Sequence, residues 1–365
     1  MRGKEKNKKV IIAMSGGVDS AVAAALLKKD NFDVIGVFMK FWKASDKDGL
    51  VNGWNKCCSS ESEARARKVA KILKIPFYVF NFEKEFKKIV VDYFLNENKK
   101  GLTPNPCVVC NKEIKFGLLL ERALKLKADY IATGHYARLR EDRLRQAYKL
   151  YKGRDKEKDQ SYFLWKLNQK QLKHILFPVG NLTRKEVEKL ARKFKLPFSG
   201  VKKSQEICFI KTTIEDFLKR YLKTKPGHII GANGKILGGH EGLYFYTIGQ
   251  RKGIRIAGGP YYVLDKNLKK DLLMVTKNEK DLYKKELIAK NVNWIIGREP
   301  KLPLRTKVKI RYRHQSASAI IVKNPKSKIK NYYKVIFDMS QRAVTPGQSI
   351  VFYKNQEILG GGTIG

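Results

Sequence analysis

Long apolar runs are missing from this sequence of 365 residues. No stretch of about 18 consecutive apolar residues occurs, which argues against a membrane-spanning helix. The opening segment MRGKEKNKKV is charged and leads directly into the strand-like VIIAM, without the apolar segment and cleavage site of a signal peptide. We therefore expect a cytoplasmic protein with no membrane partner, and the length suggests two or three domains.

Cysteine is scarce, with five residues at irregular spacing. An odd and irregular set argues against a secreted disulfide scaffold, so the cysteines are expected to be catalytic, metal-binding or inert. Cys107 and Cys110 form the one C-x-x-C pair. Cys208, in EICFI, has the apolar neighbours of a buried core cysteine, and we expect Cys57 and Cys58 to be inert.

Acidic residues are also few, with 34 Asp and Glu against 77 Lys and Arg, a formal charge of +43. Drift toward lysine codons fits the richness in Lys, Ile and Asn, but drift alone should not suppress acidic residues this far. A positive field of this size attracts polyanions, and nucleic acid is the usual one. A membrane surface is less favoured, because no long basic amphipathic helix with an aromatic-rich apolar face occurs.

Strand and helix patterns alternate through the first 200 residues or so. Ser60, followed three residues later by Glu63, has the spacing of a capping box at the start of one helix. This alternation predicts parallel βαβ units and a doubly wound sheet. The expected strands are residues 9–14, 32–41, 75–82 and 128–136, and the expected helices are one ending near 27 and those at 60–73, 83–99 and 111–127.

The pattern changes near Ser204. Residues 205–285 are rich in glycine and carry short strand-like pieces, which predicts a small α+β or mostly β module. From about Glu286 apolar and polar residues alternate between turn signals, as in a small antiparallel β-barrel. The predicted fold is therefore α/β, with three domains at 1–204, 205–285 and 286–365.

The glycine turn SGGVDS, residues 15–20, lies between the first strand and the first helix. Gly16 and Gly17 permit tight turning, and the exposed amides with the helix N-terminus form an anion site. The turn lacks the Lys-Ser/Thr ending of a Walker A loop and is not GxGxxG. Asp19 beside a phosphate makes sense if Mg²⁺ lies between them. A turn that merely connects strand to helix is the alternative.

All six residues together resemble the PP-loop of the N-type ATP pyrophosphatases. Those enzymes cut ATP between the α and β phosphates, attach AMP to a substrate oxygen and release pyrophosphate. Met39 and the TGHY turn, residues 133–136, lie at the carboxyl ends of predicted strands, where open α/β sheets bind ligands. Gly134 would allow close approach of backbone and nucleotide, and His135 would either bond a substrate or cap the turn.

Motifs along nearly the whole chain, in the same order, resemble the tRNA-specific 2-thiouridylase family. The set matters more than any one of its members, and it runs from about residue 9 to 362. The motifs are AMSGGVDSAVAA, FMKFW, TPNPCVVCNKEIKF, ATGHYAR, KDQSYFL, FPVGNLTRKEV, EICFI, YTIGQRKG, YYVLDKN, RYRHQ and RAVTPGQSIVFY.

The resemblance implies a reaction on tRNA. The wobble uridine is flipped into the site, ATP adenylates its O2 oxygen, and a sulfur nucleophile attacks C2 and displaces AMP. In the family, the cysteine matching Cys208 carries a persulfide supplied by a cysteine desulfurase or a relay protein. The cysteine matching Cys110 releases that sulfur, leaving a Cys110–Cys208 disulfide. Cys110 would lie at the start of a helix, where the helix dipole favours a thiolate.

The resemblance also assigns binding residues. A basic and aromatic stretch such as RYR suits phosphate contact and base stacking, although an exposed strand face has the same pattern. The ATP residues would be Ala13, Met14, Ser15, Gly16, Gly17, Val18, Asp19, Ser20, Met39 and Gly134. The target-base residues would be Asn105, Pro106 and Cys107, and the tRNA residues would be His135, Lys158, Asp159, Gln160, Arg311, Tyr312 and Gln348, the last three on the anticodon arm.

One position departs from the family pattern, since the family usually has an aspartate where this chain has Cys107. The change puts an acid/base or positioning role of that residue in doubt and creates three candidate thiolates, Cys107, Cys110 and Cys208. Three are one short of a closed zinc site but sufficient for a [4Fe–4S] cluster with one open iron. The competing interpretation keeps the persulfide mechanism, with Cys107 as a bystander or resolving thiol.

Two other functions stay open on the sequence alone. Another PP-loop enzyme, such as a tRNA lysidine synthetase or an amidotransferase synthetase, would not need both Cys110 and Cys208. A non-catalytic tRNA- or nucleotide-binding protein would bind ATP without releasing pyrophosphate. The family resemblance suggests tRNAs for Lys, Glu and Gln as substrates, and we expect a monomer that binds one tRNA.

Overall fold

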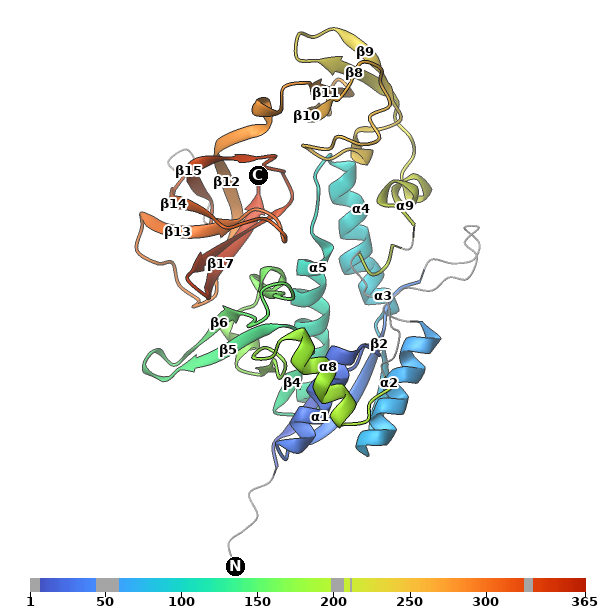
Figure 1. Cartoon of the computed structure of the whole chain (residues 1–365), viewed down its shortest axis with the longest axis vertical. Helices are drawn as coiled ribbons and strands as arrows, with labels where there is room; N and C mark the ends of the chain where they lie inside the picture. Colours follow the sequence, from blue (N-terminus) through green and yellow to red (C-terminus); the bar gives the residue numbers. More distant parts are fainter. Residues whose placement is uncertain (1–6, 44–58, 198–206, 211, 325–330) are drawn as a thin grey trace, which may run out of the picture.

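The computed structural model describes residues 7–43, 59–197, 207–210, 212–324 and 331–365 (Figure 1). Cys57 and Cys58, which the sequence predicts to be inert, lie outside the described residues. Within these ranges no helix is both long and apolar enough to cross a membrane.

The predicted parallel sheet forms the N-terminal part of the molecule, with five strands in place of the four expected, because the short strand β7 was not predicted. The chain adds two strands on one side of β1 and later two on the other, so the direction of winding changes between β1 and β4. The sheet order is β3 (Phe77–Asn81), β2 (Asp33–Lys40), β1 (Lys9–Ala13), β4 (Tyr130–Ala132) and β7 (Ile175–Leu176).

Helices cover both faces of this sheet. In β1, Val10 and Ile12 are buried in the apolar cluster shared with the first two helices, whereas Ile11 and Ala13 are buried with α6 on the other face. Alternate residues of a strand point to opposite faces, so both faces of β1 need apolar residues. The covering helices include α1 (Val18–Lys29), α2 (Ser60–Leu73), α6 (Leu119–Lys125) and α8 (Arg184–Lys193).

The N-cap of α2 is Ser59, and the predicted cap at Ser60 is wrong by one residue. Ser59 has extended backbone angles, and its Oγ accepts a hydrogen bond from the Ser62 amide at 3.1 Å. Ser60 is already helical, so its side chain cannot occupy the capping position.

Two long helices run alongside each other from the sheet toward the upper part of Figure 1. Both contain π-helical turns, which occur frequently at functional sites. The first comprises α3 (Glu83–Phe86), η2 (Lys87–Val91) and α4 (Asp92–Lys99). The second comprises α5 (Pro106–Val109), η3 (Cys110–Leu118) and α6.

The second long helix begins at Pro106, five residues before the predicted start. Asn105 is its N-cap and Pro106 occupies the first helical position. Proline suits that position because its φ is already helical and its missing N–H would have had no intrahelical partner. Cys110 is therefore one turn inside the helix, and the prediction that it lies at the helix start is wrong.

A hairpin connects the N-terminal part to the C-terminal barrel. It consists of β5 (Ala137–Asp142), the short turn η4 (Arg143–Arg145) and β6 (Ala147–Lys152). β6 pairs with the last strand of the chain through Leu150 opposite Ile358. Three short elements complete this region: η5 (Ser161–Leu164), α7 (Gln169–Leu172) and β7.

The central module is a four-stranded sheet preceded by a helix, in agreement with the predicted α+β module. Its own small core includes Ile229, Val263, Leu273 and Val275. The elements are α9 (Ile214–Tyr221), β8 (Gly227–Gly231), β9 (Ile236–His240), η6 (Leu243–Phe245), β10 (Tyr262–Asn267) and β11 (Leu272–Thr276).

The predicted C-terminal barrel is confirmed. Six antiparallel strands close on themselves because β12 pairs with both β15 and β17. In order around the barrel they are β12 (Tyr283–Trp294), β15 (Tyr333–Arg342), β14 (Ala317–Lys323), β13 (Leu304–Lys309), β16 (Ser349–Lys354) and β17 (Glu357–Ile364), and η7 (Glu279–Leu282) precedes them.

Candidate functional site

The glycine turn lies at the carboxyl end of β1, next to the point where the sheet changes winding direction. Gly16 has φ +72°, and a side chain there would collide with the Ser62 carbonyl oxygen. Only glycine fits such a position without strain. The Nε of Arg65 donates to the Gly16 carbonyl at 3.1 Å, so α2 holds the turn in place.

The N-terminus of α1 is shaped to receive an anion. Its N-cap is Gly17, which has no side chain to occupy the first-turn amides. Ser20 Oγ accepts a hydrogen bond from the Ser15 amide at 3.2 Å and donates to the Gly17 carbonyl at 3.0 Å. These bonds keep the turn rigid, and the amides at the start of α1 have no partner within the helix, as at any helix N-terminus.

The TGHY turn after β4 packs directly on the glycine turn. A Cβ on Gly134 would lie 2.6 Å from the Ser20 amide nitrogen and 2.7 Å from the Asp19 carbonyl carbon. Gly134 therefore lets this turn approach the start of α1, and its contact with the nucleotide stays a prediction. Met39, predicted to contact the nucleotide, lies at the carboxyl end of the adjacent β2.

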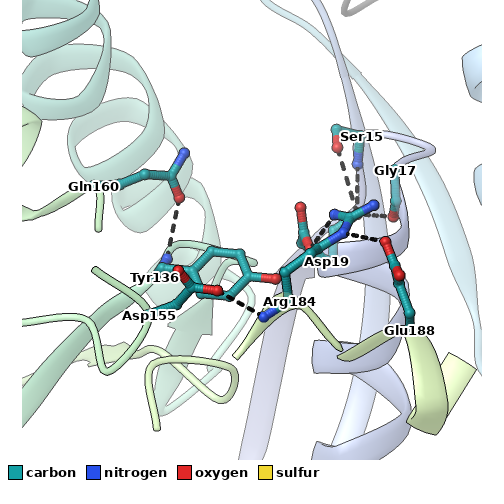
Figure 2. A network of polar contacts seen from close by, with 9 residues as sticks. Ser15, Gly17, Asp19, Tyr136, Asp155, Gln160, Arg184 and Glu188 are labelled. Carbon is teal, nitrogen blue, oxygen red and sulfur yellow. Dashed lines mark hydrogen bonds and ion pairs between the residues drawn. The ribbon is translucent and has the colours of Figure 1, made fainter. Parts of the chain in front are cut away.

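Asp19 is the centre of a polar network that Figure 2 shows. The hydroxyl of Tyr136 donates to Asp19 Oδ1 at 2.7 Å, and Nη1 of Arg184 donates to the same oxygen at 2.8 Å. Burial, followed by the nearby Asp19 charge, raises the pKa of Tyr136, so its hydroxyl remains a donor. Nε of Arg184 also donates to Glu188 at 2.7 Å.

The predicted tRNA residues Lys158, Asp159 and Gln160 belong to a loop that supports this network. Gln160 Oε1 accepts from the Tyr136 amide at 3.1 Å, and the Gln160 amide donates to the Tyr136 carbonyl at 3.0 Å. Asp159 is buried, and its Oδ1 accepts from the amides of Gly153 and Ser161. These two side chains therefore shape the loop and hold Tyr136.

Asp155 connects the same loop to Arg184. One oxygen of Asp155 accepts from the Lys158 amide at 3.1 Å, and the other accepts from the Arg184 amide at 2.8 Å. The carboxylate thereby joins the start of α8 to the Lys158 turn. A displacement of this turn would be transmitted to Arg184 and hence to Asp19.

His135 is buried at 8% exposure, with the rings of Phe116 and Phe177 nearby. Its Nδ1 is 2.8 Å from Thr133 Oγ1 within the turn. Burial, and to a smaller extent the Lys115 charge, hold the pKa of His135 well below its usual range. Of the two roles expected for His135, this geometry favours capping of the turn.

The two cysteines of the C-x-x-C pair occupy different environments on one helix. Cys107 is half-buried at the second helical position, where the helix dipole acts most strongly. Cys110 is buried at 6% exposure and begins the π-helical segment η3. The dipole weakens beyond the first turn, so it favours an anion at Cys107 more than at Cys110.

Cys208 is half-buried and packs against the apolar cluster that contains Cys110, Met14 and Val18. The next residue, Phe209, packs edge-on against Phe94 with ring centroids 5.6 Å apart. Both predicted sulfur-handling cysteines and the residues at the two ends of the glycine turn therefore belong to, or pack against, the same core of the N-terminal part.

The proposed iron–sulfur ligand set is not assembled in this structure. Among the residues described, no group of three or more His, Cys, Asp or Glu side chains could hold a metal ion. Cys107 and Cys110 are three residues apart on a helix and lie near each other, but Cys208 does not complete a site with them. Within the described residues the structure therefore gives no support for a [4Fe–4S] cluster, and the cluster stays a hypothesis.

The barrel holds the loop that leads into the cysteine helix. Gln348 Nε2 donates to the Thr103 carbonyl at 3.1 Å, and the Thr103 amide donates to the Pro346 carbonyl at 2.9 Å. The predicted tRNA residue Tyr312 packs on Phe163, with ring centroids 4.5 Å apart. Arg311 is half-buried, and burial followed by the Arg342 charge lowers the pKa of Arg311.

The central module also contacts the loop before the cysteine-containing helix, through Lys266. The Nζ of Lys266 donates to the Gly101 carbonyl at 2.8 Å and to the Tyr246 carbonyl. Burial lowers the pKa of Lys266 to about 8. Residues 101–103 are therefore held by both modules just before the residues predicted to line the target-base pocket.

Sequence reasoning missed the side chains that surround Asp19. Tyr136 and Arg184 each lie inside a quoted motif, TGHY and LTRKEV, but nothing local indicates that they converge on Asp19. The capping box of Thr183 and Glu186 marks the helix start and places Arg184 in its first turn. That signal identifies the position of Arg184 and not its partner.

Family models match nearly the whole described chain in three consecutive pieces. They are a tRNA methyl transferase HUP domain over residues 8–212, a tRNA methyl transferase PRC-barrel domain over 215–277 and an aminomethyltransferase beta-barrel domain over 284–364.

Curated proteins of similar length also match. The chain is 44% identical to the tRNA-specific 2-thiouridylase MnmA of Alkaliphilus oremlandii (strain OhILAs), over 98% of this chain and 97% of that protein. It is 46% identical to the tRNA-specific 2-thiouridylase MnmA 2 of Thermoanaerobacter sp. (strain X514), over 99% and 98%. The MnmA of Clostridioides difficile (strain 630) is 44% identical, over 98% of both chains.

Proposed function

The chain belongs to the family of tRNA-specific 2-thiouridylases, and we propose that it converts a wobble uridine of tRNA to 2-thiouridine. The observation that carries this proposal is the apolar cluster in which Cys110, Met14 and Val18 are buried together, with Cys208 packed against it. One core therefore supports an anion-binding turn and both predicted sulfur-handling cysteines, which together would form the site. Such a site can activate a substrate with ATP and then deliver sulfur to it.

In the first step the uridine O2 attacks the α-phosphorus of ATP. The bond to the bridging β-oxygen breaks, its electron pair leaves with pyrophosphate, and the N3 proton is lost. The amides at the start of α1 would bind the phosphates. Mg²⁺, when bound, neutralises phosphate charge, and Asp19 fits it because its carboxylate keeps acceptor capacity beyond the two bonds to Oδ1.

In the second step sulfur replaces AMP at C2. A persulfide on Cys208 is attacked at its Sγ by the Cys110 thiolate, and the terminal sulfur leaves as hydrosulfide while a Cys110–Cys208 disulfide forms. The hydrosulfide attacks C2, and AMP leaves with the electron pair of the C2–O2 bond. A thiol reductant then restores both cysteines. A cysteine desulfurase or a sulfur relay protein supplies the persulfide.

The tRNA would lie across all three parts of the chain, and a net charge of +43 supports a polyanionic substrate. We propose that residues 1–204 carry out catalysis and that residues 205–285 and 286–365 bind the tRNA. The protein would act as a monomer in the cytoplasm. Asn105, Pro106 and Cys107 would line the base pocket. Lys158, Arg311, Tyr312 and Gln348 would contact the tRNA, and the buried His135 and Asp159, with Gln160, would hold the TGHY turn and the Lys158 loop beneath it.

The test is mass spectrometry of nucleosides from tRNA incubated with the protein, ATP, Mg²⁺ and a persulfide donor, together with an assay of pyrophosphate release. We expect 2-thiouridine from the wild type. Cys110→Ser and Cys208→Ser should release pyrophosphate but form no 2-thiouridine, and Asp19→Ala should do neither.

Each alternative function predicts a different result. A PP-loop enzyme of another class would release pyrophosphate without making 2-thiouridine, and the cysteine substitutions would leave that release unchanged. A protein that only binds nucleotide or tRNA would release no pyrophosphate. Either outcome contradicts the proposal.

A further inference from the structure

We propose that Arg184 is the cation that binds the β- and γ-phosphates of ATP, an inference that rests on the proposed function. The glycine turn lacks the lysine with which a Walker A loop reaches these phosphates. Pyrophosphate is nevertheless the leaving group of the adenylation step, so its growing negative charge needs a partner. Arg184 is placed to be that partner.

The guanidinium of Arg184 lies beside the anion-binding turn. It contacts Asp19 Oδ1 at 2.8 Å, and Asp19 is the second residue of α1. It is therefore within about one helical turn of the first-turn amides. Figure 2 shows Arg184 reaching Asp19 from α8, while Tyr136 approaches from the end of β4.

A guanidinium has donors to spare for this purpose. It carries five N–H bonds, and the contacts of Arg184 with Glu188 and Asp19 use Nε and Nη1. Its planar fork matches two phosphate oxygens at once, which a lysine ammonium cannot do. The side chain is about one quarter exposed, at 24%, so it can be reached by a ligand.

The surrounding contacts allow the Arg184 guanidinium to leave Asp19 and to bind a phosphate. Mg²⁺ held by Asp19 would compensate part of the carboxylate charge that Arg184 compensates in this structure. Tyr136 still holds Asp19 Oδ1 through its hydroxyl, so the carboxylate keeps its orientation. The Arg184 backbone stays anchored by Asp155, so only the side chain needs to turn.

The other arginine at the turn is already committed to a structural contact. Arg65 donates from Nε to the Gly16 carbonyl and from Nη2 to Ser62 Oγ at 2.9 Å. Both acceptors are part of the framework that shapes the turn. Arg184 instead contacts Asp19, the carboxylate in the first turn of α1, and is the better placed of the two for a phosphate.

The inference predicts a selective effect on ligands. ATP and pyrophosphate contain the phosphates that Arg184 would contact, whereas AMP lacks them. Titration calorimetry of ATP, pyrophosphate and AMP with Mg²⁺ is the direct measurement. Arg184→Ala should weaken ATP and pyrophosphate binding by about tenfold or more and AMP binding by less than about twofold.

Two further variants separate this role from a structural one. Arg184→Lys keeps the charge without the fork and should recover part of the affinity for ATP. Arg192→Ala removes an exposed arginine from the last turn of the same helix and should bind all three ligands like the wild type. Far-ultraviolet circular dichroism checks that each variant is folded.

A failure of the Arg184 role and a failure of the proposed function give different experimental results. Equal losses for ATP and AMP in Arg184→Ala and Arg184→Lys, or no loss for either, would overturn the role of Arg184. A wild-type protein that binds none of the three ligands would overturn the proposed function instead.

Discussion

The side-chain amide of Gln348 donates a hydrogen bond to the backbone carbonyl of Thr103, 3.1 Å away. Gln348 belongs to the barrel, and Thr103 lies three residues before the start of the cysteine helix. The Thr103 amide donates to Pro346 of the same barrel turn. The barrel thus holds the loop that leads to the predicted base pocket. A tRNA bound on the barrel would therefore be aligned with that pocket.

The first prediction concerns this contact. Gln348→Ala removes the donor to Thr103, so the loop before Pro106 should lose part of its alignment. We expect the rate of thiolation at saturating tRNA to fall by about tenfold, while calorimetry shows an unchanged affinity for ATP.

Gln341→Ala is the matched control, because Gln341 lies in the same barrel and also donates to a backbone carbonyl, that of Met339. It should keep the wild-type rate. If Gln348→Ala thiolates tRNA at the wild-type rate, the barrel does not align the loop through this bond.

The second prediction concerns Tyr136. Tyr136→Phe keeps the ring but removes the hydroxyl that donates to Asp19 at 2.7 Å. A hydrogen bond to a charged group contributes about 1.5–3 kcal/mol, so pyrophosphate release at saturating ATP should slow by about ten- to a hundredfold. Tyr130→Phe, in the preceding strand, removes a hydroxyl away from Asp19 and should be silent. Equal rates in both variants would contradict the role of Tyr136.

The parts of the fold that depend on neighbouring residues could be predicted from the sequence. The sheet, the glycine turn and the barrel follow from local periodicity and turn signals, and all are confirmed. The exact helix starts could not be predicted. Ser59 and Ser60 are both suitable N-cap residues, and only the backbone angles show that Ser59 is the N-cap. The helical apolar pattern begins at about residue 111, so it predicts a later start than Pro106.

The network around Asp19 could not be predicted in the same way. Its members come from distant positions, with Tyr136 separated from Asp19 by 117 residues and Arg184 by 165. No local pattern records such a contact, and it exists because the TGHY turn and α8 both pack beside α1. The cysteine set could not be predicted either, because the spacing of Cys107 and Cys110 does not show where the distant Cys208 lies, and the cluster hypothesis stays a prediction.

The third prediction is a pH dependence caused by His135. Burial keeps its pKa in the folded protein well below the value of about 6.5 in an unfolded chain. As the pH falls below that value, His135 becomes protonated in the unfolded state but stays neutral in the folded state. The stabilising contribution is therefore present above about pH 6.5 and is lost on acidification.

The His135 effect can be isolated with a substitution. His135→Gln cannot titrate, so thermal unfolding between about pH 7 and pH 5 should lower its midpoint less than that of the wild type. His228→Gln, on the exposed side of β8, serves as the control and should follow the wild type. Parallel curves for His135→Gln and wild type would show that His135 does not contribute.

The fourth prediction concerns Cys107, the residue at which the chain departs from the family pattern. Cys107 occupies the second position of its helix and is half-buried. An aspartate there would face the positive end of the helix dipole, which contributes about 0.3–1 kcal/mol to the stability of the helix. The persulfide mechanism uses Cys110 and Cys208 and makes no demand on Cys107.

We therefore expect Cys107→Asp to form 2-thiouridine at the wild-type rate or faster, whereas Cys110→Ser forms none. Cys107→Ser, which removes the thiol without adding charge, should also stay active. A cluster held by all three cysteines predicts the opposite, because losing one of three ligands would abolish it. Iron and sulfide analysis of the anaerobically purified wild type and Cys107→Asp variant completes the comparison. If the wild type contains iron, and Cys107→Asp loses both the iron and the activity, the prediction is wrong. The three cysteines would then bind a cluster in a conformation different from the one described.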